Sequence, residues 1–234
     1  MDNGNHADYG SAVFAGWRAA SADQWQQYLH HEFVNGLGDG SLDERAFVQY
    51  LIQDYIFLLH YSRAWSMAVV KSETVESMRI AAATVDALIN EETRLHVGVC
   101  AEHGITERDL ARAEEARENL SYTRYVMDTA LSGDLLDLLA ALAPCVFGYG
   151  EIGLRLDHCT DTTPAYRAWI DTYRDEAYQS VCHGVAGLIE SVAASRLGDQ
   201  PLHHPRWPGL CERFRMATAL EVDFWGMGLR LARP

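Results

Sequence analysis

Apolar side chains recur every three or four residues along most of the chain, the spacing that places them on one face of an α-helix. No run of alternating β-branched residues is long enough to predict a sheet. The spacing predicts seven long helices, over residues 10–30, 42–70, 74–103, 107–131, 134–158, 164–196 and 210–231. Long helices joined by short loops predict an all-α fold, a helical bundle, and we expect one domain over residues 1–234.

Local signals predict several helix ends. The glycines of the segment GLGDGSL (36–42) are expected to break the chain after the first helix. Ser41, followed three residues later by Glu44, has the capping-box pattern and is expected to cap the second helix. Pro164 falls near the first turn of the sixth helix, where proline is favoured. Pro144 lies inside the fifth helix, where proline removes a hydrogen bond and is expected to kink the chain.

Two acidic residues stand on helix faces that are otherwise apolar. Asp54 follows the apolar stripe of the second helix, and Glu221 follows that of the seventh. A buried carboxylate is costly unless it is paired or hydrogen-bonded. Asp54 therefore indicates either a structural contact with a neighbouring Arg or Tyr or a functional role. Glu221 indicates either an ion pair, with Arg155 or Arg174 for example, or a ligand site between facing helices.

A cysteine and several tyrosines fall on the apolar faces of the middle helices. Cys145 and Tyr149 are four residues apart, so they are neighbours on one face. Cys145 is consistent with either a small buried apolar residue or a thiol beside an opened pocket. Further tyrosines on the fourth to sixth helices would either stack on a flat heterocycle or simply fill the core; they are Tyr122, Tyr125, Tyr166 and Tyr173.

The composition of the chain limits the classes of partner and the location that we expect for the protein. The formal net charge is −14, which disfavours nucleic acid and anionic membrane surfaces as partners. The apolar stretch over residues 135–149 is interrupted by Asp137 and Pro144, and we expect it to be too short to span a bilayer. The polar first ten residues do not have the pattern of a signal peptide. Five cysteines without a CxxC pair predict reduced thiols and a cytoplasmic protein.

Six segments, in order, resemble the motifs of the TenA/thiaminase II family. The opening segment over residues 30–65, HHEFVNGLGDGSLDERAFVQYLIQDYIFLLHYSRAW, is similar to the family's start. INEETRLH (89–96) resembles its E-x-x-x-H helix, and NLSYTRYV (119–126) its tyrosine segment. The remaining three segments are ALAPCVFGYGEIG (141–153), YRAWIDTY (166–173) and ALEVDFWGMG (219–228). Together the matches cover nearly the whole chain.

The resemblance implies a haem-oxygenase-like helical bundle that assembles as a homotetramer. It implies an enzyme that uses no metal or cofactor and hydrolyses the bond at the methylene carbon of thiamin or of 4-amino-5-aminomethyl-2-methylpyrimidine. The product would be the hydroxymethylpyrimidine that re-enters thiamin synthesis. By position in the motifs, Cys145 falls on the family's nucleophile, Glu221 on its catalytic acid and Asp54 on the aspartate that holds the pyrimidine ring.

The resemblance also assigns pocket residues and shows departures from the family pattern. Tyr122, Tyr149 and Tyr173 fall on tyrosines of the substrate pocket, and Phe57 stands where many members have tyrosine. Phe147 replaces a common tryptophan. Gly148 and Gly150 stand where bulkier residues are usual, which predicts a wider pocket. These differences leave the natural substrate less certain than the chemistry.

Two other functions compete with this hypothesis. Bundles of this shape also hold di-iron sites, and Glu92 and His96, four residues apart, are suitable ligands for one metal. His103 beside Cys100 has a spacing that does not complete a four-ligand zinc site. The chain is also consistent with a non-catalytic pyrimidine-binding protein. Binding alone does not require a thiol, however, and therefore Cys145 together with Glu221 and Asp54 favours catalysis.

Overall fold

A computed structural model of the chain describes residues 8–232, and every regular element in this range is helical. The α-helices are α1 (Ala12–Ala20), α2 (Ala22–Leu29), α3 (Glu32–Asp39), α4 (Glu44–Lys71), α5 (Val75–Ala87), α6 (Thr93–Glu102), α7 (Glu107–Leu110), α8 (Arg117–Ser132), α9 (Leu135–Leu156), α10 (Pro164–Arg174), α11 (Glu176–Leu197) and α12 (Trp207–Leu231). A π-helical turn, η1 (Leu88–Glu92), joins α5 to α6, and a 3-10 turn, η2 (Pro201–His203), precedes α12. The all-α prediction is confirmed.

Helix α9 forms the centre of the bundle. It contacts α2, α4, α8, α10, α11 and α12. Of its residues only Asp137, Leu154 and Arg155 are not buried, as expected for a helix that is apolar on all sides. By length and composition α9 could cross a membrane, so the expectation that this stretch is too short is wrong for the helix as a whole, although nearly all of it is buried inside the protein.

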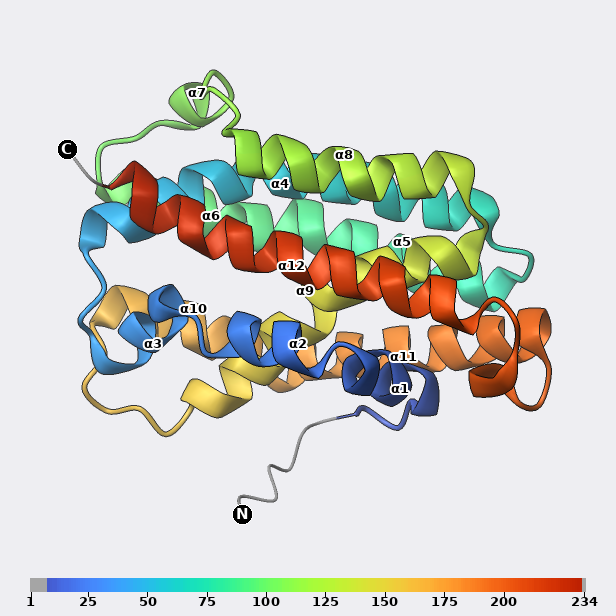
Figure 1. Cartoon of the computed structure of the whole chain (residues 1–234). Helices are drawn as coiled ribbons and strands as arrows, with labels where there is room; N and C mark the ends of the chain where they lie inside the picture. Colours follow the sequence, from blue (N-terminus) through green and yellow to red (C-terminus); the bar gives the residue numbers. More distant parts are fainter. Residues whose placement is uncertain (1–7, 233–234) are drawn as a thin grey trace, which may run out of the picture.

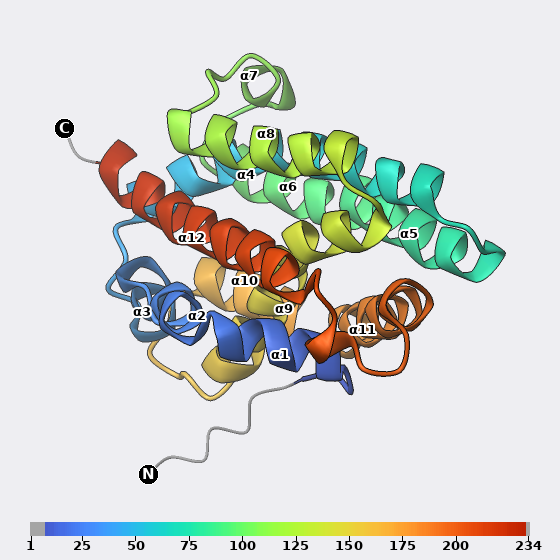
Figure 2. The same ribbon diagram turned by 45° about the vertical axis from the view of Figure 1, so that its right-hand side comes forward.

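The other helices cover α9 on two sides. Helices α4, α5, α6 and α8 lie on one side, and α1, α2, α3, α10 and α11 lie on the other (Figure 1). Helix α12 runs along α9 and contacts α2, α4 and α8 (Figure 2). Side chains of α4, α8, α10 and α12 can therefore meet those of α9 in the interior.

Several predicted helices are divided in the structure. The first is interrupted at Ser21, and this turn lets Trp17 and Trp25 both pack on the ring of Phe214, with centroid distances of 6.0 and 5.5 Å. In one straight helix these two tryptophans would be about 12 Å apart along the axis and could not share a ring. The sixth predicted helix is divided at Asp175, which has extended backbone.

The predicted helix over 107–131 begins at Glu107, as expected, after Thr106, which forms a capping box with Asp109. Its first part, however, ends after one turn. Residues 111–116 are not helical, and the chain resumes as α8 at Arg117. The predicted helix over 74–103 contains the turn η1, which the apolar spacing does not reveal. Thr163 caps α10 and Pro164 occupies its first turn, which confirms that prediction.

The start of α4 and the glycine segment before it differ from the predictions. Asp43, not Ser41, caps α4, because its carboxylate accepts a hydrogen bond of 2.8 Å from the backbone N–H of Arg45. Gly36 and Gly38 lie within α3 and do not break it. Gly38 leaves room for Leu156 and Cys159, which would lie 2.9 and 3.1 Å from a Cβ atom at this position.

Candidate active site

The seven residues predicted to form the site meet in the interior of the bundle. Helix α4 contributes Asp54 and Phe57, α8 contributes Tyr122, α9 contributes Cys145 and Tyr149, α10 contributes Tyr173, and α12 contributes Glu221. Cys145 is 9% exposed, and none of the other six is more than 4% exposed. The thiol is therefore the most accessible member of the group.

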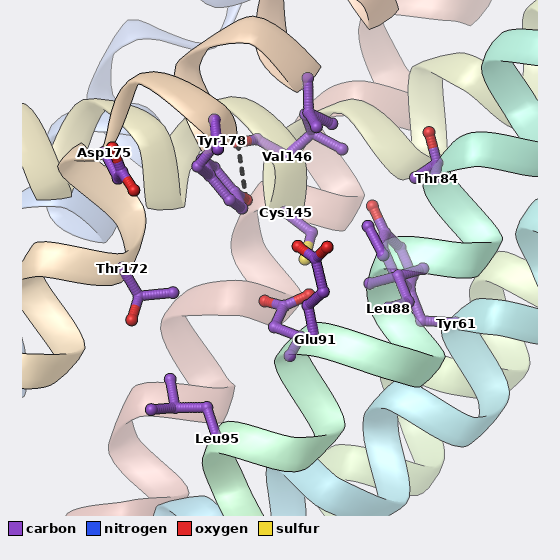
Figure 3. A pocket seen from close by; sticks show the side chains of 14 residues that line it. Tyr61, Thr84, Leu88, Glu91, Leu95, Cys145, Val146, Thr172, Asp175 and Tyr178 are labelled. Carbon is purple, nitrogen blue, oxygen red and sulfur yellow. Dashed lines mark hydrogen bonds between the residues drawn. The ribbon is translucent and has the colours of Figure 1, made fainter.

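A cavity of about 290 Å³ reaches Cys145 from the surface. Figure 3 shows Tyr61, Glu91 and Tyr178 around it, with the thiol of Cys145 directed into the space between them. The volume is at the lower end of the range of about 300–1,000 Å³ that is typical of small-molecule sites. Of the seven predicted residues only Cys145 lines this cavity; the other six pack behind it.

Glu221 is a buried carboxyl with one well-formed hydrogen bond. The hydroxyl of Tyr122 donates to its Oε1 atom at 2.8 Å. Burial raises the pKa of Glu221 to about 8; the hydrogen bond from Tyr122 acts to lower it, and the nearby charge of Asp54 acts to raise it. At neutral pH this carboxyl is therefore mostly protonated and can act as an acid.

Cys145 is a neutral thiol in the resting protein. Burial raises its pKa well above the ordinary value, and the carboxyl groups of Glu221, Glu92 and Asp54 raise it further. The adjacent helical turn is held by the hydroxyl of Tyr61, which donates to the carbonyl oxygen of Leu142 at 2.7 Å. A reactive thiolate has to be formed by proton transfer when a ligand binds, because this environment does not favour a standing negative charge.

Asp54 forms a buried pair with His96, a residue of α6. The Nε2 atom of His96 lies 2.5 Å from Oδ2 of Asp54, and the hydroxyl of Tyr50 donates to the same oxygen at 2.9 Å. On the other side of the ring, Nδ1 lies 2.7 Å from the carbonyl oxygen of Glu92. The structure therefore contains the polar contact with a tyrosine that the sequence left open for Asp54, and adds a histidine.

These contacts fix where the protons lie. A carbonyl oxygen only accepts, so Nδ1 of His96 must carry a hydrogen. One further proton is held between Nε2 and the carboxylate of Asp54. Burial lowers the pKa of His96, but the charge and hydrogen bond of Asp54 outweigh burial and leave it raised. His96 is then a cation that neutralises Asp54 inside the protein.

Aromatic rings surround these polar groups in two sets. Phe57 lies between Tyr61 and Tyr122, with centroid distances of 5.1 and 5.0 Å. Tyr149 and Tyr173 lie 4.8 Å apart on the other side of α9. The hydroxyl of Tyr173 donates to Oε1 of Glu92 at 2.8 Å, so this tyrosine supports an acidic residue. Of these five rings only that of Tyr61 lines the cavity, and the other four pack in the interior.

The wider pocket expected from two glycines is not present. A Cβ atom on Gly148 would lie 1.9 Å from the ring of Tyr28, and one on Gly150 would lie 2.7 Å from the hydroxyl of Tyr9 and 2.9 Å from the sulfur of Cys182. Large side chains from elsewhere in the sequence already occupy the space that these glycines leave. That expectation is wrong, because each glycine allows a close approach between helices.

The structural alternatives for Glu221 and the metal alternative can also be compared with the contacts. Arg155 donates to the carbonyl oxygen of Leu29 and to Asn35, and Arg174 pairs with Asp157 and Asp171. The ion pair suggested for Glu221 is therefore formed by neither arginine.

Both ring nitrogens of His96 are engaged, with Asp54 and with the backbone of Glu92, so neither offers a free lone pair to a metal. Within residues 8–232, no group of three or more His, Cys, Asp or Glu side chains is arranged to hold a metal ion.

Four further residues complete the site: sequence reasoning missed Tyr50 and Tyr61, and it considered Glu92 and His96 only as metal ligands. The E-x-x-x-H segment contained a signal for Glu92 and His96, but spacing alone suggested a metal. Tyr50 precedes Asp54 by one helical turn, a signal that was available from the sequence.

Known proteins resemble this chain in sequence and in overall fold. The sequence profile described as the TENA/THI-4/PQQC family matches residues 18–231. An aminopyrimidine aminohydrolase of Halalkalibacterium halodurans is 30% identical over 205 residues, which cover 87% of this chain and 89% of that protein. A crystal structure from a Silicibacter species, described as a TenA family transcription regulator, has a TM-score of 0.92 and 50% identity, covering 95% of this chain and 98% of the other.

A more distant structure supports the fold alone. A domain of unknown function from Shewanella denitrificans, described as having a haem-oxygenase-like fold, has a TM-score of 0.69 at 10% identity and covers 91% of this chain and 90% of its own. The expected haem-oxygenase-like bundle is therefore confirmed. With the profile matching nearly the whole length, this chain belongs to the TENA/THI-4/PQQC family.

Proposed function

We propose that this protein is an aminopyrimidine aminohydrolase of the thiaminase II type, which cleaves the bond between the methylene carbon and its leaving group. Its substrates would be thiamin or 4-amino-5-aminomethyl-2-methylpyrimidine, and its product 4-amino-5-hydroxymethyl-2-methylpyrimidine. The observation that carries the proposal is the accessible thiol of Cys145 at the floor of the cavity, beside the protonated carboxyl of Glu221. The name of the Halalkalibacterium relative supports the substrate class.

The first chemical step uses Cys145 and Glu221 together. Glu221 gives its proton to a ring nitrogen, which makes the pyrimidine electrophilic, and the sulfur of Cys145 forms a bond to a ring carbon. The thiol proton replaces the one that Glu221 gave away, so no free thiolate is needed before binding. This exchange fits a thiol whose pKa is raised by burial next to a neutral acid.

Asp54 and the two aromatic sets would orient the ring. The carboxylate of Asp54, balanced by His96, accepts hydrogen bonds from the amino group of the pyrimidine. Because Phe57 and Tyr149 pack in the interior, binding requires their two aromatic sets to separate and flank the ring, while Tyr122 and Tyr173 hold the carboxyls of Glu221 and Glu92. A planar ring held in this way places one carbon near the sulfur, which supplies much of the rate enhancement through orientation.

The proposal is tested by following hydroxymethylpyrimidine release from both substrates. Cys145→Ser should lose nearly all release, whereas Cys211→Ser, a partly buried cysteine of α12 away from the cavity, should retain it. Glu221→Gln should lower turnover by about 10²–10⁴-fold and still bind pyrimidine. Release that survives in Cys145→Ser, or no release by the unmodified protein from either substrate, would contradict the proposal.

A role limited to binding or regulation is the other candidate. The Silicibacter relative is described as a transcription regulator. The net charge of −14 opposes direct contact with DNA, and neither regulation nor binding requires a thiol beside a protonated acid. A protein that binds pyrimidine tightly but releases no product would support this second candidate.

We also propose that the protein is a homotetramer in the cytoplasm. Three large apolar side chains lie exposed near the junction of α4 with α5 and the end of α8: Val70 (74% exposed), Val75 (62%) and Leu131 (69%). Exposed apolar patches of this kind mark association surfaces. Light scattering of the purified protein measures the assembly, and a monomer at micromolar concentration would contradict it.

A further inference from the structure

Glu92 is an acidic residue of the cavity that the first chemical step does not use. It lines the cavity together with Cys145, whereas Glu221 does not. Its Oε1 atom accepts a hydrogen bond of 2.8 Å from the hydroxyl of Tyr173. Glu92 is half-buried, with its exposed part on the cavity side, so a ligand in the cavity can reach the carboxyl.

The backbone at Glu92 is specialised. Residues Leu88–Glu92 form the π-helical turn between α5 and α6. The carbonyl oxygen of Leu88 accepts from the backbone N–H of Thr93 and, at 2.7 Å, from its side-chain hydroxyl. A π-turn adds one residue to a helix and is frequent at functional sites. Here it allows Glu92 to line the cavity while His96, one turn later, reaches Asp54.

Glu92 and Glu221 occupy different positions relative to the cavity. Glu221 packs behind Cys145, where a bound ring would present its nitrogen. Glu92 lies on the cavity wall whose rim is formed by exposed residues, Glu91 and Asp175 among them. A substituent on the methylene carbon must point away from the buried ring and toward this opening, because the interior is filled. It then passes the carboxyl of Glu92.

The pKa of Glu92 suits a carboxyl that both donates and accepts a proton. Burial raises its pKa to about 7, and the charge of Asp54 raises it too, whereas His96 and the hydrogen bond from Tyr173 act to lower it. A group with a pKa near the working pH is effective both as an acid and as a base.

We propose that Glu92 is a second catalytic acid, which protonates the nitrogen that leaves the methylene carbon; this rests on the proposed function. The carbon–nitrogen bond breaks, its electron pair stays on nitrogen, and the proton from Glu92 completes ammonia. The electrons of the sulfur-bound ring form a double bond to the methylene carbon. The carboxylate of Glu92 then removes a proton from water as the water oxygen bonds to that carbon. The first step next runs in reverse: the carbon–sulfur bond breaks with its electron pair on sulfur, Glu221 returns the thiol proton to Cys145, and the ring nitrogen gives its proton back to Glu221. One water is consumed, one ammonia is released, and Glu92 regains its proton.

The test compares two leaving groups. Ammonia needs a proton to leave, whereas the thiazolium of thiamin leaves as neutral thiazole without one. In Glu92→Gln, kcat/KM for the aminomethylpyrimidine should fall by about 10²–10⁴-fold, the usual contribution of general acid catalysis. The loss on thiamin should be at least about tenfold smaller, because only water activation is affected. Glu102→Gln, which changes an exposed glutamate at the end of α6 that does not line the cavity, is the control and should change both substrates equally and little.

The outcomes separate this inference from the function on which it rests. Glu92→Gln must first retain pyrimidine binding. A glutamine at this position permits this, because its amide oxygen can still accept the hydrogen bond from the hydroxyl of Tyr173. A loss that is at least about tenfold larger on the amine substrate than on thiamin supports Glu92 as the acid. Equal losses on both substrates, or rates like those of Glu102→Gln, overturn this inference, while release by the unmodified protein keeps the proposed function. No release by the unmodified protein overturns both.

Discussion

Glu221 and Glu92 each accept a hydrogen bond of 2.8 Å from a tyrosine hydroxyl, yet their surroundings differ. Glu221 packs in the interior, where no cation among residues 8–232 is paired with it, and its pKa is raised to about 8, mainly by burial. Glu92 lies on the cavity wall near His96, which offsets part of the effect of burial, and its pKa is raised to about 7. The same combination, a glutamate with a tyrosine hydroxyl, thus has two different carboxyl pKa values because the neighbouring residues differ.

This difference suggests a division of labour. An acid that stays protonated through neutral pH suits the ring nitrogen, which must receive a proton before sulfur adds. An acid that is half ionised near neutral pH suits the later steps. Its protonated form can protonate the leaving group, and its carboxylate form can then take a proton from water. Two titratable groups whose environments separate their pKa values are typical of acid and base assignments in one site.

The largest expected effect is that of Glu221→Gln, which keeps the shape and removes the proton. We expect kcat to fall by about 10²–10⁴-fold on thiamin and on the aminomethylpyrimidine alike, because both reactions begin with proton transfer to the ring. Steady-state rates and pyrimidine binding measure this. A loss on only one substrate would contradict the assignment of Glu221 to the ring.

A second prediction concerns the packing behind Glu221. Gly148→Ala would place a Cβ atom 1.9 Å from the ring of Tyr28, a residue that acts to lower the pKa of Glu221. We expect a loss of stability of about 1–3 kcal/mol from overpacking, together with slower turnover of both substrates.

Gly226→Ala in α12 is the matched control, since no atom outside its own helix lies within 4 Å of a Cβ atom there. It should leave stability unchanged or raise it by up to about 1 kcal/mol, because alanine favours the helix. Chemical denaturation of both variants measures the difference. Equal stability of the two variants would contradict the close packing of Tyr28 on α9.

The three polar residues at the centre of the site were predictable because they interrupt apolar stripes. Cys145, Asp54 and Glu221 each fall at a helical spacing where a residue should be buried, and a buried polar group requires a partner or a purpose. The all-α fold followed from the same spacing. Breaks in the helices were harder to predict. The break at Ser21, for example, is accompanied by a long-range contact, in which Trp17 and Trp25 both pack on one ring of the distant helix α12.

The parts that sequence did not reveal depend on long-range contacts and on one irregular turn. The turn Leu88–Glu92 contains neither glycine nor proline, so its π geometry has no local signal. Counting along a regular helix therefore misplaces Glu92 and His96 relative to α5. The partner of His96 is Asp54, 42 positions earlier in the sequence, and only the packing of α6 on α4 brings them together.

A third prediction concerns stability against pH. The ordinary pKa of a glutamate is about 4.5, and Glu221 is raised in the folded protein to about 8. Between these values the folded state holds a proton that the unfolded state has lost, so stability must fall as pH rises. Each such group contributes a slope of up to about 1.4 kcal/mol per pH unit. Glu221→Gln should flatten the slope between pH 5 and 8.

Denaturant unfolding at pH 5, 6, 7 and 8 measures this slope. Glu92→Gln should flatten it over a shorter range, ending near pH 7, because the pKa of Glu92 is raised less. Glu91→Gln is the control for removing an exposed acid. The same pH dependence in all three variants and the unmodified protein would show that neither buried carboxyl keeps its proton on folding.

The smallest expected effect is a shift in pH dependence when Tyr122 or Tyr173 loses its hydroxyl. Each hydroxyl acts to lower the pKa of its carboxyl, so Tyr122→Phe should raise the pKa of Glu221 and Tyr173→Phe that of Glu92. A net hydrogen-bond contribution of about 0.5–1.5 kcal/mol corresponds to a shift of up to about one pH unit. Turnover depends on protonated Glu221, so its alkaline decline should begin at higher pH in Tyr122→Phe, with both substrates.

Tyr173→Phe should instead shift the pH dependence more strongly for the aminomethylpyrimidine than for thiamin, since thiazole departs without a proton from Glu92 and thiamin needs this residue only to activate water. Tyr166→Phe is the matched control, because its buried hydroxyl donates to the carbonyl oxygen of Leu42 and not to a carboxyl. Rates measured from pH 6 to 9 with both substrates show whether the two tyrosines affect different steps. If the two site variants shift both substrates equally, the two acids titrate as one coupled unit, and their separate roles have to be abandoned.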